Sequence, residues 1–129
     1  MIYLTNYGFV RVGSAVPEMR VADCAFNTEK ILQLMEQAAE QKVYITVFPE
    51  LCLTGYTCGD LFGQPLLQKA ALDSLKKLVQ ASSRHNNVFI AGLPVMIDQQ
   101  LYNCAAVLQK GRILGIVPKR YIPNYNEFY

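Results

Sequence analysis

Residues 44–48 (YITVF) constrain the fold most, because this short run is β-branched and aromatic and has no polar face beyond one threonine. Such a run is typical of a central strand that is covered on both sides, since a half-exposed strand alternates apolar and polar residues. The run ends at Pro49-Glu50. We therefore expect a strand inside a layered fold, followed directly by a loop.

The segments around this strand predict an α/β fold. Residues 9–15 (FVRVGSA) alternate apolar and polar and predict a strand with one buried face. One helix pattern begins after Asp23, the expected N-cap, and a second begins at Pro65 and runs out near residue 84. Three more strands are expected at residues 88–93, 102–109 and 112–117, the last two joined in a β-hairpin through residues 109–111. This order of strands and helices indicates α/β layers.

Two helices can cover only one face of a sheet of five strands. A stable monomer avoids exposing the other face, because large apolar patches associate. We therefore expect a partner sheet or further chain to cover it. The isolated chain should aggregate or dimerise through that face, and sedimentation analysis would detect this.

Composition limits the classes of protein to which the chain can belong. It has 129 residues, 52% of them apolar and 17% charged, which fits part or all of one globular domain and not a disordered chain. The longest apolar stretch, residues 88–97, is half of the ~20 residues that cross a bilayer. A net charge of +2 with scattered cations argues against a nucleic-acid surface. No signal peptide is evident, so a cytoplasmic location with reduced thiols is expected.

Two charged residues follow predicted strands and are candidate catalytic groups. Glu50 lies where α/β sheets place their sites, at the carboxyl end of a strand, and could act as a general base. The alternative is a solvated loop glutamate or a helix-capping acid. Lys119 follows the last predicted strand and could stabilise an oxyanion. The alternative is a surface lysine that forms two adjacent basic residues with Arg120.

The remaining reactive residues favour structural interpretations. Cys52 could be imagined as a nucleophile beside Glu50, but it is flanked by leucines and is expected to pack as a small apolar residue. No pair of the four cysteines has zinc spacing, so no metal site is expected. His85, the single histidine, is expected to cap helix carbonyls. No glycine fingerprint of a nucleotide-binding sheet occurs.

Several motifs together resemble the nitrilase, or carbon–nitrogen hydrolase, superfamily. They are VFPELCLTGY at 47–56 and YNCAAVLQKGRILGIVPKRYIPNYNEFY at 102–129. CGDLFGQ at 58–64 and FVRVGSAVPEMRVAD at 9–23 bring the resemblance closest to the amidotransferase domain of bacterial glutamine-dependent NAD synthetases. The resemblance covers nearly the whole chain from Phe9. It implies that residues 1–129 are the N-terminal part of one nitrilase-type domain, half of an αββα sandwich, with the synthetase domain absent from this chain.

The resemblance also implies a Glu–Lys–Cys triad. Glu50 would be the general base and Lys119 would steady the tetrahedral intermediate. Tyr56, Tyr125 and Phe128 resemble residues that line the glutamine pocket. The family's cysteine lies in a later block, so the nucleophile is expected outside this chain, and the chain alone is expected to be inactive.

The function implied is glutamine hydrolysis that supplies ammonia to NAD synthesis. Glutamine would be the substrate, with no nucleic-acid or membrane partner and with assembly into a homo-oligomer through the sheet face. No cofactor is expected in this chain, while ATP and Mg²⁺ would belong to the missing synthetase domain. The alternatives are another nitrilase-type amidase or nitrile hydrolase, or a non-catalytic interaction module.

Overall fold

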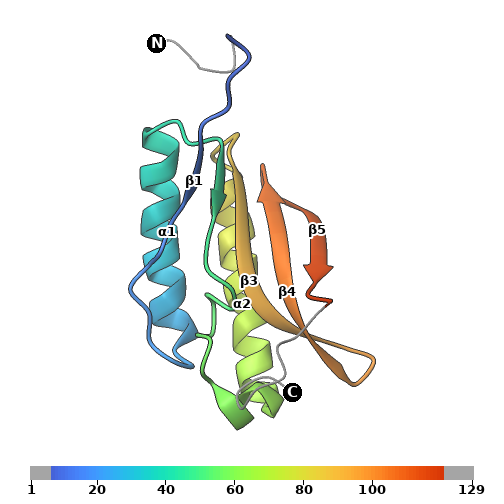
Figure 1. Cartoon of the computed structure of the whole chain (residues 1–129). Coiled ribbons are helices and arrows are strands. Elements are labelled where there is room, and N and C mark those ends of the chain that lie inside the picture. The colour runs from blue at the N-terminus through green and yellow to red at the C-terminus, as the bar shows by residue number, and fades with distance from the viewer. Residues whose placement is uncertain (1–6, 121–129) are drawn as a thin grey trace.

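The computed structural model describes residues 7–120, in which five strands form one sheet beside two long helices (Figure 1). The elements in chain order are β1 (Val12–Ser14), α1 (Cys24–Glu40), β2 (Ile45–Val47), the 3-10 helix η2 (Gly59–Gly63), α2 (Pro65–Ser82), β3 (Val88–Ile97), β4 (Gln100–Gln109) and β5 (Arg112–Pro118). The expected α/β class is confirmed.

Both helices begin where the sequence indicates. The Asp23 carboxylate accepts a hydrogen bond from the Phe26 N–H at 3.0 Å, which satisfies one of the free donors of the first turn of α1. Pro65 is the first residue of α2, where its missing N–H costs nothing. α2 ends at Ser82, slightly before the predicted end.

The sheet combines parallel and antiparallel pairing in the order β1-β2-β3-β4-β5. β1, β2 and β3 are parallel, which requires the helical crossovers between them. β3, β4 and β5 are antiparallel and are joined by two-residue turns. In each turn both residues have positive φ, at Asp98-Gln99 and at Lys110-Gly111, as type I′ hairpins require.

All five strands differ in length from their predictions, β2 and β5 by no more than two residues. β1 spans three residues, because only these pair with β2. β3 continues to Ile97 and β4 begins at Gln100, since Ile97 and Gln100 pair across a hairpin that the sequence did not predict. Pro94 had suggested an earlier end to β3. Pro94 is tolerated because Asn103, its partner in β4, uses its own carbonyl to accept the Lys119 N–H on the β5 side of β4.

The hydrophobic core lies between the helices and one face of the sheet. Its strand residues alternate, as a half-buried sheet requires. The fully buried members include Phe89, Leu93 and Leu108 from the sheet and Ile31 and Leu78 from the helices. No helix in residues 7–120 is long and apolar enough to cross a membrane.

The opposite face of the sheet is not covered by a helix from residues 7–120. We call it the open face and define it by the side chains of Val47, Ile90, Ala105, Val107 and Val117, which follow one another across the strands by register. Val47 is 44% exposed and Val117 59%. The prediction that residues 44–48 are covered on both sides is therefore wrong for these residues, because both helices lie on one side (Figure 1).

Candidate functional site

Glu50 lies in a tight turn that closes against the middle of β3. The turn follows β2, and the Leu53 N–H binds the Gly92 carbonyl at 3.1 Å. A Cβ atom on Gly92 would lie 2.4 Å from the Leu51 nitrogen and 3.0 Å from the Pro49 carbonyl oxygen. Only glycine therefore allows the turn to approach β3 this closely without a shift.

Two side chains of the described part of the chain bind the Glu50 carboxylate. The Asn103 amide of β4 donates to Glu50 Oε1 at 2.5 Å, and Lys119 Nζ lies 2.8 Å from the same oxygen. The side chains of Glu50 and Lys119 are 37% and 31% exposed, so the ion pair is neither fully buried nor freely solvated. The two charged residues predicted from separate motifs thus meet in space.

A hollow of about 310 Å³ on the open face contains this group. Its floor is apolar and comes from β2, β3, β4 and β5, with Val47, Ile90 and Val117 among the lining residues. Glu50 and Lys119 are the only charged side chains that line it within the described residues. The hollow therefore combines an apolar floor with one ion pair, which is typical of small-molecule sites.

A second set of contacts fixes the turn from behind. Leu51 has a φ of +55°, a strained value for a leucine, and its carbonyl accepts the Gly55 N–H at 2.8 Å. Asn27 of α1 is fully buried, and its amide donates to the Leu53 carbonyl at 3.2 Å and to the Arg20 carbonyl at 2.9 Å. The surrounding structure thus holds the strained turn in place.

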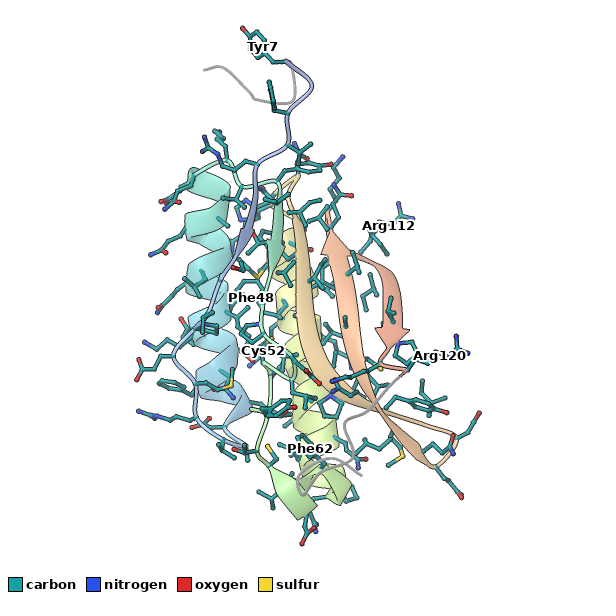
Figure 2. The ribbon with its side chains drawn as sticks, in the orientation of Figure 1. Tyr7, Phe48, Cys52, Phe62, Arg112 and Arg120 are labelled. Carbon is teal, nitrogen blue, oxygen red and sulfur yellow. The ribbon has the colours of Figure 1, made fainter. Side chains whose placement is uncertain are left out.

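The four cysteines of the chain are all buried. Burial raises the pKa of Cys52 to about 11, so this thiol is protonated at neutral pH. Its sulfur lies against the Gly92 backbone, at 3.3 Å from the nitrogen, and Figure 2 shows it in the interior near Phe48. The expectation that Cys52 packs as a small apolar residue is confirmed, and a Glu50–Cys52 dyad is not formed.

The other predicted residues have different outcomes. Tyr56 follows the turn and does not line the hollow formed by the described residues. Tyr125 and Phe128 lie outside the described residues. The His85 ring contacts the Glu36 carboxylate of α1 at 3.2 Å and packs edge-on against Phe89, so the prediction that it caps helix carbonyls is wrong.

Two residues of the site were missed in the sequence. Asn103 is a polar residue in the otherwise apolar strand YNCAAVL, and Gly92 interrupts the apolar run of β3. Each departure from strand composition was a signal, since a glycine inside a strand often marks a close backbone approach. The sequence did not show the register of β3 and β4, which places Gly92 and Asn103 beside Glu50.

This arrangement can perform acid–base chemistry on a neutral substrate. A carboxylate that is held by two donors can accept a proton and return it, while an ammonium group beside it can stabilise a developing negative charge. No group of three or more metal-ligating side chains occurs within residues 7–120.

Comparison with known proteins identifies relatives along almost the whole chain. A family model described as carbon-nitrogen hydrolase matches residues 11–128. A glutamine-dependent NAD(+) synthetase of Mycobacterium leprae is 37% identical over 124 residues, which are 96% of this chain. The chain covers only 18% of that relative's length.

Solved structures agree with the sequence comparison. A glutamine-dependent NAD(+) synthetase from Cytophaga hutchinsonii superposes with a TM-score of 0.83 at 30% identity, over 89% of this chain and 20% of that one. An amidase from Nesterenkonia sp. superposes with a TM-score of 0.70 at 20% identity and shares the fold. The chain covers 44% of the amidase chain.

Proposed function

The chain belongs to the carbon-nitrogen hydrolase family, and from that premise we propose that it is part of the glutamine-hydrolysing domain of a glutamine-dependent NAD synthetase. The observation that carries the proposal is the contact between Glu50 and Lys119 at an apolar hollow. Similarity to NAD synthetases over 96% of the chain supports glutamine as the substrate.

In the proposed reaction a cysteine thiol attacks the side-chain carboxamide carbon of glutamine. Glu50 takes the thiol proton and passes it to the nitrogen as the carbon–nitrogen bond breaks and ammonia leaves. Lys119 stabilises the oxyanion of the tetrahedral intermediate. Water then hydrolyses the thioester to glutamate and restores the thiol, with Glu50 again transferring the proton.

The nucleophile in this proposal comes from outside the 129 residues. Cys24 and Cys52 are buried, and burial raises the pKa of each thiol to about 11, which disfavours the reactive thiolate. Burial also raises the pKa of Cys58 and of Cys104. Glu50 and Lys119 therefore need a partner segment that brings an activated cysteine over the open face.

The same partner segment would cover the open face. We propose that this face packs against a second sheet, within the same polypeptide or across a homo-oligomer, because Val47 and Val117 are apolar and exposed. ATP and Mg²⁺ would bind in a synthetase domain that is absent from this chain, a proposal supported by the similarity to NAD(+) synthetases, of whose length the chain covers only 18%. A cytoplasmic location remains part of the proposal.

The test compares Glu50→Gln and Lys119→Met in the full-length protein with Glu40→Gln and Lys110→Met. Both controls make the same change at exposed residues away from the hollow. We expect the first pair to lower the rate of glutamine hydrolysis by roughly 10²–10⁴-fold and the controls to leave it unchanged. Full activity in Glu50→Gln would contradict the proposal.

Substrate preference separates the proposal from its two alternatives. A preference for glutamine over simple aliphatic amides supports the synthetase assignment, and the reverse preference supports a stand-alone amidase. A full-length protein that hydrolyses neither, with its Glu50–Lys119 pair intact, would support the interaction module.

A further inference from the structure

Asn103 contacts both charged members of the site. Its side-chain amide donates to Glu50 Oε1, and its main-chain carbonyl accepts the Lys119 N–H at 2.7 Å. Asn103 lies within β4, which pairs with β3 on one side and with β5 on the other.

Asn103 makes its two contacts with different parts of the residue, one with the main chain and one with the side chain. Its backbone N–H and C=O point toward β5, because it faces Pro94 of β3 across a pair without hydrogen bonds. Its side chain is therefore the part that reaches the turn that carries Glu50. Residues on a paired strand are more rigid than residues on loops, and both Glu50 and Lys119 lie outside strands.

The two side-chain donors also share one oxygen. Asn103 Nδ2 and Lys119 Nζ both bind Glu50 Oε1, so the carboxylate is oriented with Oε2 directed away from them. A general base must present one oxygen at a fixed place to the proton that it abstracts.

We propose that Asn103 is a positioning residue of the hydrolysis: it orients Glu50 so that Oε2 takes up the proton, and it sets the spacing between Glu50 and Lys119. This inference rests on the proposed function. Asn103 itself contacts no reacting atom in the proposal, and it acts through the carboxylate that it holds.

The deciding variant is Asn103→Asp in the full-length protein, because aspartate keeps the size of the side chain but replaces the N–H donor with an acceptor. The aspartate also places a second negative charge beside the Glu50 carboxylate. We expect kcat for glutamine to fall about 10–100-fold with little change in KM, and the acidic limb of the pH–rate profile to move to higher pH. Among residues 7–120, Lys119 is the other charged group that lines the hollow with Glu50.

The matched control is Gln109→Glu, the same chemical change on the same strand. Gln109 binds the Asn86 carbonyl and the Tyr44 hydroxyl at the far end of β4, so kcat and the pH profile should stay unchanged. If Asn103→Asp does not fold, Asn103→Ser gives the same readout with a hydroxyl too short to reach Glu50.

An unchanged pH profile and kcat in the Asn103 variants, with Glu50→Gln inactive, would overturn this inference and leave the proposed function intact. Full activity in Glu50→Gln would instead overturn the proposed function and with it the role of Asn103. A lower melting temperature with an unchanged pH profile would show that Asn103 is only structural.

Discussion

The two faces of the sheet differ in what their side chains do. The helix-covered face is filled by apolar side chains such as Phe89, Leu93 and Leu108, which have almost no exposed surface. The open face is also apolar, yet it is partly exposed and carries Glu50, Asn103 and Lys119 in one hollow. Stability therefore comes mainly from one side of the sheet, and the candidate chemistry lies on the other.

This separation shows why only a few strand residues determine the geometry of the site. Alternate residues of β3 point to opposite faces, so Leu93 belongs to the core while its neighbour Gly92 lies under the Glu50 turn. Substitutions one residue apart should consequently have different effects on folding and on activity.

The largest effect on stability is expected for Leu93→Ala. Leu93 is fully buried, and its truncation should lower the free energy of unfolding by about 2–5 kcal/mol through lost burial and a cavity. Leu66→Ala is the control, because Leu66 is 82% exposed on α2 and should change stability by less than about 0.5 kcal/mol. Denaturant unfolding of the full-length protein measures both, and equal costs would contradict the difference between core and surface.

Gly92→Ala should affect both stability and activity. The added Cβ would lie 2.4 Å from the Leu51 nitrogen, so the turn must shift, at a cost of about 1–3 kcal/mol. The shift should move Glu50 and lower glutamine hydrolysis by up to about 10²-fold. Gly115→Ala on β5 is the control, because no described atom lies within 4 Å of its added Cβ. A fully active Gly92→Ala enzyme would show that the turn does not depend on this contact.

At neutral pH the smallest effect is expected from the buried thiols, which change stability only in alkaline solution. The pKa of Cys24 and of Cys52 is raised by burial from 9.0 to about 11, so the folded protein keeps protons that the unfolded chain has released. Stability should be unaffected below about pH 9 and fall between pH 9 and 11, by roughly 1.4 kcal/mol per pH unit for each thiol. Unfolding curves across this range measure the slope, and Cys52→Ala should reduce it. An identical slope in Cys52→Ala would contradict the assignment to this thiol.

Much of the fold was predictable because its signals are local. Asp23 and Pro65 mark helix starts, and the alternation of apolar residues identifies the strands. The Asp98-Gln99 hairpin was not predicted, because neither residue is a glycine and both nevertheless adopt positive φ. The hydrogen bonds between β3 and β4 compensate for that strain. These bonds cannot be predicted from the residues of the turn itself.

The site was predictable only in part for the same reason. Glu50 and Lys119 could be named from motifs, and the structure brings them together. Asn103 and Gly92 gained their roles from strand register, which depends on residues far away in the chain. Tyr125 and Phe128 stay predictions.

The sheet also suggests an order of assembly. Asn103 lies on β4 and Lys119 directly follows β5, and these two strands are joined by a two-residue turn, whereas Glu50 is 53 residues from Asn103 and 69 from Lys119 along the chain. Closing long loops costs more conformational entropy than closing short ones, so we expect the β3–β5 meander to form early and the parallel strands to join it later. The ion pair between Glu50 and Lys119 would then form only when the contact between the most distant segments has formed. During refolding, the amide hydrogens of the Glu50 turn would therefore be the last to gain protection from exchange.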